Sequence, residues 1–204
     1  MDILIPAKSF RRGKSRLASV LSPTVRARLC RDLLGRTLAV ARSTGARVAV
    51  VTEDEEVAAL ALAAGAMALP DPGVGLNAAV AHGAALLGHA APLVVLPADL
   101  PALSAAALLA AAEVPGVTLV PDRHEDGTNL LVLGPAERAR FGFAYGPGSL
   151  ARHRAEAARL GASCRIFRHP ALAHDIDTAA DLGLWPLAPH YTARRDSPCS
   201  RTRS

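Results

Sequence analysis

Five cationic side chains lie between residues 7 and 16 of this 204-residue chain: Lys8, Arg11, Arg12, Lys14 and Arg16. Lys8 and Lys14 are the only two lysines in the sequence, so arginine supplies the positive charge everywhere else. Two lysines together suggest a position that needs a compact point charge, with chance clustering as the alternative. Such a loop could hold a polyanion, for example a nucleoside triphosphate, through its charges and backbone N–H groups. A solvated basic loop is the simpler explanation.

A single carboxylate, Asp99, directly follows a run of apolar residues and lies between Pro97 and Pro101. This position predicts a rigidly placed carboxylate at the end of a buried strand. Because Mg²⁺ takes one or two protein carboxylates together with waters and substrate phosphates, Asp99 is a candidate metal ligand. An aspartate that caps a turn is the alternative.

Two further carboxylates, Asp175 and Asp177, come just before a predicted helix near the end of the chain. Residues two apart in an extended chain share a face, so either could complete a metal site if this segment returns to Asp99. A helix N-cap is the alternative, because Thr178 and Asp181 have the spacing of a capping box.

Two glycine-containing segments form a third group, Gly127-Thr128-Asn129 and Gly146-Pro147-Gly148-Ser149. The second segment precedes a predicted helix, where backbone N–H groups and nearby hydroxyls favour anions. A small phosphorylated acid could bind there. An ordinary loop with Ser149 as the helix N-cap is equally compatible with this spacing.

The hydrophobic pattern predicts the framework that must position these groups. Strands are predicted over residues 2–6, 47–52, 66–69, 92–97, 117–121, 129–133 and 163–168. Helices are predicted from Ser22 as N-cap to Gly45, and over 54–64, 76–87, 104–112, 150–160 and 178–184. Continuous apolar strands alternating with helices are typical of an α/β fold whose mostly parallel sheet is covered on both faces. Ligands bind beyond the carboxyl ends of such strands.

Composition narrows the class of protein. Half of the residues are apolar, so one domain can bury a core, and no apolar run is long enough to cross a membrane. The short, acidic N-terminus does not resemble a signal peptide, and we expect a cytoplasmic protein. The net charge of +5 comes largely from an arginine-rich C-terminal tail, and the body lacks the basic clusters with aromatics that nucleic-acid binding needs. The three cysteines form neither a zinc pattern nor a disulfide framework.

Several common motifs are absent. A P-loop would need a glycine where Lys8 stands, no Gly-x-Ser-x-Gly sequence indicates a hydrolase, and no GxGxxG follows the first strand. The seven histidines lack ligand spacing, and we assign none of them as a catalytic base.

Read together, the segments resemble the family of 2-phospho-L-lactate and phosphoenolpyruvate guanylyltransferases that act in the biosynthesis of coenzyme F-420. The resemblance covers residues 3–184. It rests on Ile5-Pro6-Ala7-Lys8, Lys14-Ser15-Arg16-Leu17, Leu76-Asn77, Ala98-Asp99-Leu100-Pro101, Gly127-Thr128-Asn129, Gly146-x-Gly148-Ser149 with His153, and Asp175-Ile176-Asp177-Thr178 with Asp181-Leu182. Asp126 departs from the family, which often has glycine there, and Ala179 stands where the family often has proline.

The resemblance implies a GT-A-like (Rossmann-like) nucleotidyltransferase fold. We place the transferase domain over residues 1–187, and the composition of residues 188–204 predicts a disordered basic tail. It implies transfer of GMP from GTP to the phosphate of a small phospho-acid, with release of pyrophosphate. By this likeness Lys14 and Asp99 are catalytic. Lys8, Lys14, Arg16 and Asn77 bind the nucleotide, Thr128, Gly146 and Ser149 bind the phospho-acid, and Asp99, Asp175 and Asp177 bind Mg²⁺.

The physical demands of that reaction agree with these residue types. The acceptor phosphate is already an anionic nucleophile, so the difficulty is to bring one anion onto the α-phosphorus of another. Cations and positioning relieve this difficulty.

The acceptor is chosen on amino-acid usage. Arginine- and alanine-rich, lysine-poor usage suggests a GC-rich bacterium rather than a methanogen, and this favours phosphoenolpyruvate over 2-phospho-L-lactate or 3-phospho-D-glycerate. The alternatives are a molybdopterin-type or sugar-phosphate nucleotidyltransferase and, outside enzymes, a nucleotide- or RNA-binding module. We expect no membrane and no specific nucleic-acid partner, and a homodimer stays open.

Overall fold

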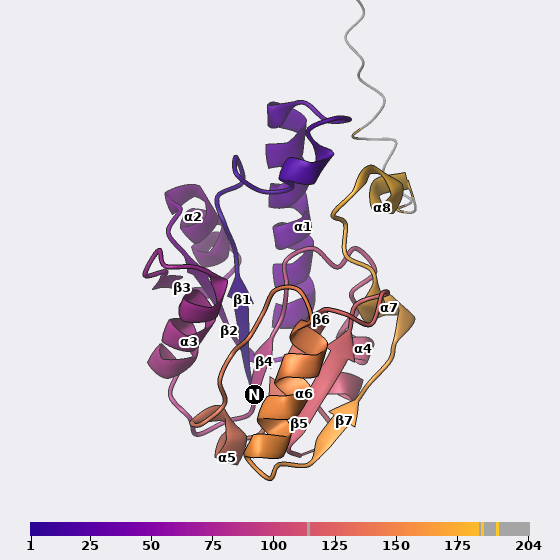
Figure 1. Ribbon diagram of the computed structural model, residues 1–204. Coiled ribbons are helices and arrows are strands. Elements are labelled where there is room, and N and C mark those ends of the chain that lie inside the picture. Colours follow the sequence, from indigo (N-terminus) through magenta and orange to yellow (C-terminus); the bar gives the residue numbers. More distant parts are fainter. Residues whose placement is uncertain (114, 184, 186–190, 192–204) are drawn as a thin grey trace, which may run out of the picture.

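A computed structural model of the chain describes residues 1–113, 115–183, 185 and 191. Its centre is a seven-stranded sheet in the order β3-β2-β1-β4-β6-β5-β7 (Figure 1). Neighbouring strands are parallel, except that β6 runs antiparallel to both β4 and β5. The predicted mostly parallel sheet is therefore confirmed. The strands are β1 (Asp2–Pro6), β2 (Arg47–Thr52), β3 (Met67–Pro70), β4 (Leu93–Val95), β5 (Val117–Pro121), β6 (Thr128–Leu133) and β7 (Cys164–Ile166).

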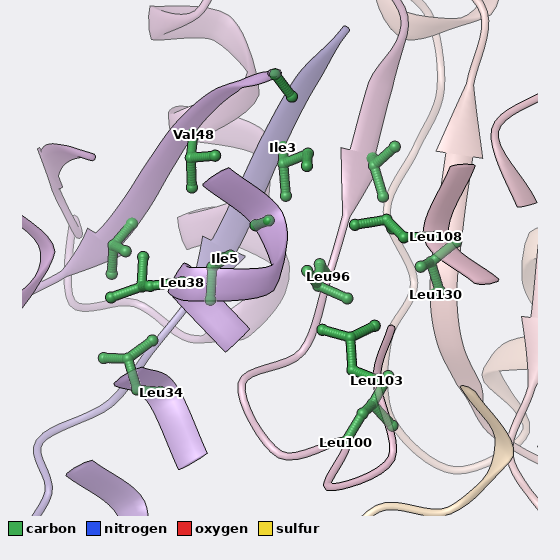
Figure 2. Close-up of a cluster of buried hydrophobic side chains, with 14 of the residues drawn as sticks. Ile3, Ile5, Leu34, Leu38, Val48, Leu96, Leu100, Leu103, Leu108 and Leu130 are labelled. Carbon is green, nitrogen blue, oxygen red and sulfur yellow. The ribbon is translucent and has the colours of Figure 1, made fainter. Parts of the chain in front are cut away.

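Helices cover both faces of the sheet, as predicted. Ile3 and Ile5 of β1 face the layer that contains α1, α2 and α4, whereas Leu4 faces α3 and α6, because successive strand residues point to opposite faces. Figure 2 shows Ile3 and Ile5 packed with Leu38 of α1. The helices are α1 (Pro23–Ser43), α2 (Glu55–Ala63), α3 (Leu76–Leu86), α4 (Ala105–Ala111), α5 (Pro135–Arg138), α6 (Ser149–Arg159), α7 (Pro170–Ala173) and α8 (Ala179–Gly183), with a 3-10 turn, η1, at Ser15–Leu17.

The antiparallel strand β6 follows from a tight turn after β5. The carboxylate of Asp122 accepts hydrogen bonds from the backbone N–H groups of His124, Asp126 and Gly127, which closes the turn. Thr128 consequently pairs with Pro121. Because β6 runs in reverse, its first residue lies at the rim where the parallel strands end.

A small apolar cluster joins η1 and α1 to the last described residues of the chain. Leu17 of η1 and Leu29 of α1 pack in one cluster with Ile176, Leu182, Trp185 and Tyr191. The rings of Trp185 and Tyr191 stack with their centroids 5.4 Å apart. This cluster ties the end of the basic loop to the segment that carries Asp175 and Asp177.

A buried ion pair closes the opposite rim of the sheet. Asp2 of β1 accepts hydrogen bonds from Arg138 of α5 at 2.6 Å and from Arg47 of β2 at 2.8 Å. Asp2 and Arg138 are each only 3% exposed. Burial alone would raise the pKa of Asp2, but hydrogen bonds from Arg47 and Arg138 lower it below its ordinary value.

Some predicted boundaries differ from the structure. Strand β4 ends at Val95 rather than at residue 97, consistent with Pro97 having no N–H to continue the ladder. The alternative that made Ser149 the helix N-cap is wrong, because Ser149 is the first residue of α6 and Gly148 caps the helix in a left-handed conformation (φ 68°). The short helices α5 and α7 were not predicted. The predicted tail over 188–204 lies outside the described residues, except for Tyr191.

No helix among the described residues combines the length and the apolar character that spanning a bilayer requires.

Candidate active site

A cleft of about 730 Å³ runs along the carboxyl ends of β3, β2, β1 and β4. This is the rim at which the sequence predicted ligand binding. Three cations of the basic loop line it, Lys8, Arg12 and Lys14, together with Asp99 and Asp177. The lining at the β2 and β3 side comprises Glu53, Asp71, Gly73, Gly75 and Leu76.

Lys14 stands at the centre of the charged part of this cleft. Its Nζ donates to Asp99 Oδ2 and, at 2.8 Å, to Asp177 Oδ1, and its side chain is only 9% exposed. Burial alone would lower the pKa of the Lys14 ammonium, but the charges of Asp99 and Asp177 raise it above its ordinary value. The side chain is therefore a fixed positive charge between two carboxylates.

The backbone of Lys14 is also unusual. It adopts the left-handed conformation, with φ 53° and ψ 41°, which costs a residue with a Cβ roughly 1–2 kcal/mol. Such strain persists where surrounding contacts enforce it, and it occurs often at functional sites. Here the following residues are held by Leu17 in the apolar cluster, so the loop turns Lys14 back toward Asp99.

Three carboxylates converge around this position. Asp99, Asp175 and Asp177 each offer an oxygen, and these oxygens lie within 4.8 Å of one another. A backbone hydrogen bond from Ile176 N to Asp99 O, 3.2 Å long, holds the two segments together. Burial, and then the charge of Asp99, raises the pKa of Asp175. The structure thus brings together the carboxylates that the sequence singled out.

This group of carboxylates fits a hard divalent cation. Asp99 Oδ1 is buried and has no hydrogen-bond partner among the described residues, which is costly for a carboxylate oxygen unless a ligand completes it. Oxygen ligands of this kind are the ones that Mg²⁺ prefers. The capping box that the sequence offered as an alternative is also present, because Asp181 Oδ2 accepts from Thr178 N at 2.7 Å. That capping box uses Asp181 and does not involve the carboxylates of Asp175 and Asp177, of which Asp177 lines the cleft and pairs with Lys14.

The remaining cations of the basic loop are more exposed. Lys8 lines the cleft with its side chain in solvent. Arg16 Nη1 lies 3.5 Å from Asp177 Oδ2, with a side chain that is 75% exposed. Arg12 pairs with Glu53 at 3.1 Å across the mouth of the cleft. Lys8 and Arg16 are thus placed to approach an anion without being committed to a buried contact.

Thr128, Ser149 and His153 form a second polar group, outside the lining of the cleft. Thr128 N donates to Ser149 Oγ at 2.9 Å, and Thr128 Oγ1 lies 3.0 Å from His153 Nδ1. Ala144 N donates to His153 Nε2 at 3.0 Å, so we assign the ring proton to Nδ1. Burial, helped by the charge of Arg152, lowers the pKa of His153 to about 4. The ring is therefore neutral at physiological pH and donates to Thr128.

The N-terminus of α6 is already occupied by a carboxylate from the same chain. Gly148 N donates to Asp126 Oδ2 at 2.9 Å, and Leu150 N donates to Asp126 O at 3.0 Å. One of the two interpretations of the sequence was an anion site at this position, and the structure shows one N–H group taken by the Asp126 carboxylate and one by the Asp126 backbone carbonyl. Asp126 is exposed, so its side chain can leave without disturbing the core.

Asn77 connects this group to the cleft. Its amide donates to Tyr145 O at 3.2 Å and accepts from Tyr145 N at 2.7 Å. Both polar atoms of the side chain are thus used to hold the loop that contains Gly146 against α3. Asn77 itself is not among the residues that line the cleft, whereas its neighbour Leu76 is, and its place beside the nucleotide stays a prediction.

Sequence reasoning missed three of these relationships. It assigned no role to His153, although His153 lies one helical turn after Ser149. It treated Asp126 as a departure from a family pattern rather than as a cap for α6. It assigned no role to Glu53 and Asp71, although Glu53 directly follows the predicted strand 47–52 and Asp71 lies one residue beyond the predicted strand 66–69, a position comparable to that of Asp99.

Known proteins resemble this chain over most of its length. A family model described as "Guanylyl transferase CofC like" matches residues 1–190. A protein of Sphaerobacter thermophilus named phosphoenolpyruvate guanylyltransferase is 42% identical over 187 residues, which cover 88% of this chain and 89% of that protein. A protein of Roseiflexus castenholzii with the same name is 38% identical over 196 residues, covering 95% and 92% of the two chains.

Solved structures support the fold. A Desulfovibrio desulfuricans protein described as a nucleotide-diphospho-sugar transferase superposes with a TM-score of 0.73 at 16% identity, covering 98% of this chain and 90% of that one. A cytidylyltransferase from Leptospira borgpetersenii superposes with a TM-score of 0.58 at 15% identity, covering 88% and 82%. At these identities the likeness concerns the fold alone, which is that of nucleotidyltransferase-like enzymes.

Proposed function

This chain belongs to the CofC-like guanylyltransferase family, and we propose that it transfers GMP from GTP to the phosphate of phosphoenolpyruvate. An oxygen of the acceptor phosphate forms a bond to the α-phosphorus of GTP, the bond from that phosphorus to the bridging oxygen breaks, and pyrophosphate leaves. The product is enolpyruvyl-diphospho-guanosine, a precursor in the biosynthesis of coenzyme F-420. The names of the relatives with 38–42% identity support this acceptor over 2-phospho-L-lactate and 3-phospho-D-glycerate.

The observation that carries the proposal is the position of Lys14 between Asp99 and Asp177 at the end of the strands. Transfer between two phosphates needs positive charge at the reacting centre, because the nucleophile and its target are both anionic. Lys14 supplies such a charge in a fixed position, and Lys8 and Arg16 add mobile charge beside it. In the proposal these three residues hold the triphosphate.

Mg²⁺ would be held by Asp99 with Asp175 and Asp177. When bound, it would neutralise the negative charge of the phosphates, which the three carboxylates alone would repel. The unpartnered Asp99 Oδ1 supports this assignment. Lys14 then has a second use, since it stabilises the carboxylates before the metal and the nucleotide arrive.

The acceptor would bind at Thr128, Gly146 and Ser149. A neutral His153 orients the Thr128 hydroxyl, because its Nδ1–H occupies one lone pair of Oγ1 and leaves the hydroxyl proton for a ligand. The carboxylate of Asp126 leaves Gly148 N when the acceptor phosphate arrives, while Asn77 keeps the loop in place. No general base is required, since the phosphate is already deprotonated.

The transferase domain is proposed to comprise residues 1–187, acting in the cytoplasm on GTP and a small phospho-acid. The proposal includes no membrane and no nucleic-acid partner. Analytical ultracentrifugation tests whether the protein forms the homodimer that the sequence left open.

The test is to incubate the protein with GTP and Mg²⁺ and, in separate reactions, phosphoenolpyruvate, 2-phospho-L-lactate or 3-phospho-D-glycerate. We expect mass spectrometry to show the GMP adduct of phosphoenolpyruvate, with equimolar pyrophosphate. The Asp99→Asn variant should release at least 100-fold less pyrophosphate, whereas Glu56→Gln, an exposed substitution outside the cleft, should not change the rate. A product with another acceptor alone would overturn the choice of phosphoenolpyruvate.

A further inference from the structure

The cleft has a second acidic position that the transfer reaction does not use. Asp71 lines it beyond the end of β3, three strands from Asp99 in the order β3-β2-β1-β4. Adjacent strands are about 4.8 Å apart, so the two ends of the cleft are separated by roughly 14 Å. If the triphosphate lies at Lys14, as proposed above, an extended nucleotide has its base near Asp71.

We propose that the Asp71 carboxylate recognises the base of the nucleotide, by accepting hydrogen bonds from the N1–H and the 2-amino group of guanine. This inference rests on the proposed function and adds the residue that selects guanine. A carboxylate has acceptors only, and guanine presents two adjacent donors on this edge. Adenine and cytosine present a ring nitrogen acceptor at the corresponding position, which the carboxylate would repel.

Asp71 is held in a fixed orientation. Its backbone N–H donates to Thr52 O at 3.1 Å, which extends the pairing of β2 with β3 by one residue. Its Oδ1 accepts from Gly73 N at 2.8 Å. Oδ1 is thus oriented by the backbone and keeps a second lone pair, and Oδ2 has no partner among the described residues, so the two oxygens can accept the two donors of guanine. A preoriented carboxylate loses little conformational entropy when it binds.

The residues after Asp71 provide apolar contact for the faces of a base. Leu76 lines the cleft with 40% of its surface exposed, and Val74 is 76% exposed on the same loop. Val74 stands between Gly73 and Gly75, which both have positive φ, at 76° and 106°. Gly73 and Gly75, on either side of Val74, line the cleft, so the exposed Val74 side chain stands beside it and is available to pack against a ligand. The site thus offers a carboxylate to the polar edge of a purine and apolar side chains to its flat faces.

Glu53 is the other carboxylate at this end of the cleft, and its contacts make it a weaker candidate. It pairs with Arg12 at 3.1 Å, so its charge is already compensated, and its side chain is 48% exposed. Glu53 is therefore expected to hold Arg12 across the mouth of the cleft rather than to discriminate between bases.

The first test uses the unchanged protein. Isothermal titration calorimetry with Mg²⁺ and no acceptor should give the order GTP, then ITP, then ATP and XTP. Inosine lacks the 2-amino group, so ITP should bind about 10-fold more weakly than GTP, the usual effect of losing one hydrogen bond to a charged group. XTP, which has a carbonyl in place of the 2-amino group, should bind at least 100-fold more weakly.

The second test is Asp71→Asn. The Gly73 N–H should hold the side-chain carbonyl of the variant, so that the amide NH₂ replaces the free oxygen. This change turns an acceptor into a donor that matches the 2-carbonyl of xanthine. We expect GTP to bind 30- to 100-fold more weakly and XTP at least 10-fold more tightly, whereas Glu56→Gln should leave both affinities unchanged.

The outcomes separate this inference from the proposed function. Equal binding of GTP and XTP by the unchanged protein, or an Asp71→Asn variant with the original order of nucleotides, would overturn the role of Asp71 while GMP transfer could still be observed. A change in the order caused by Glu53→Gln instead would assign the base to Glu53 and refute the role of Asp71. If the unchanged protein forms no GMP adduct with any acceptor, the proposed function fails, whatever the order of affinities.

Discussion

The Nζ of Lys14 and the Oδ1 of Asp177 lie 2.8 Å apart, although 163 positions separate the two residues in the sequence. The contact depends on the apolar cluster that joins η1 and α1 to Ile176 and Leu182, because this cluster fixes both segments at the rim of the sheet. The charged centre of the cleft is therefore built by a hydrophobic contact between the beginning and the end of the described chain.

The first prediction concerns the charge of Lys14. Lys14→Met keeps the length of the side chain and removes its charge, so pyrophosphate release should fall at least 100-fold. Affinity for Mg²⁺ without nucleotide should rise instead, because Asp99 and Asp177 lose their cationic partner. Calorimetry and a pyrophosphate assay measure the two effects. Arg154→Met, an exposed substitution outside both the basic loop and the cleft lining, is the matched control and should change neither value. Weaker Mg²⁺ binding by the Lys14 variant would contradict this picture.

The second prediction separates Asp175 from Asp177. If both are metal ligands, Asp175→Asn and Asp177→Asn should each weaken Mn²⁺ binding at least 10-fold, measured by electron paramagnetic resonance, since each removes one of the three oxygens. Asp177→Asn should also release Lys14 and Arg16. Binding at the original affinity by Asp175→Asn would leave Asp99 and Asp177 as the metal pair.

Much of the fold was predictable from the sequence, because apolar runs and helix caps are local signals. The cap at Ser22 is an example, with Ser22 Oγ accepting from Val25 N at 3.4 Å. The carboxylate Asp99 was predictable for a related reason, since the end of a parallel strand marks the ligand rim. The sequence could offer Asp177 as a metal ligand only if its segment lies beside Asp99 in the fold. No local signal specifies where so distant a segment lies.

Other parts of the site depend on contacts between segments. The sequence does not show that Asp126 caps α6, because the turn at Asp122 first has to bring residue 126 to Gly148. It likewise does not show that Asn77 binds the backbone of Tyr145, 68 positions away. In both cases the side chain satisfies backbone groups that only the tertiary fold brings near.

The third prediction concerns Asp126. Its carboxylate occupies Gly148 N–H, where the acceptor phosphate is proposed to bind. Asp126→Asn removes a negative charge that competes with the acceptor, so KM for phosphoenolpyruvate should fall about 3- to 10-fold with little change in KM for GTP. Initial rates at varied substrate concentrations measure this. Glu125→Gln, on the same exposed turn, controls for general charge, and a raised KM in Asp126→Asn alone would show that Asp126 supports the acceptor site instead.

The fourth prediction is a pH dependence of stability from His153. Its pKa is about 4 in the folded protein against 6.5 when unfolded, so the unfolded state binds more protons between these values. Stability should therefore fall as pH decreases from 6.5 to 4, by about 3 kcal/mol at 1.36 kcal/mol per pKa unit. Urea unfolding at several pH values measures the slope. His153→Gln should reduce it, whereas the exposed His82→Gln should not, and equal slopes in both variants would remove His153 as its source.

The last prediction concerns the rim opposite the cleft. Asp2→Ala would leave the guanidinium of Arg138, whose side chain is fully buried, without its charged partner. Removing one member of a buried ion pair costs about 3–5 kcal/mol, because the remaining charge is desolvated and uncompensated. Arg47→Met should cost only about 1 kcal/mol, since the Arg47 side chain is 50% exposed and Asp2 keeps Arg138. Urea unfolding at pH 7 compares the two variants. A similar small cost for both would mean that water reaches Arg138 and that the pair at Asp2 does not hold β1 to α5.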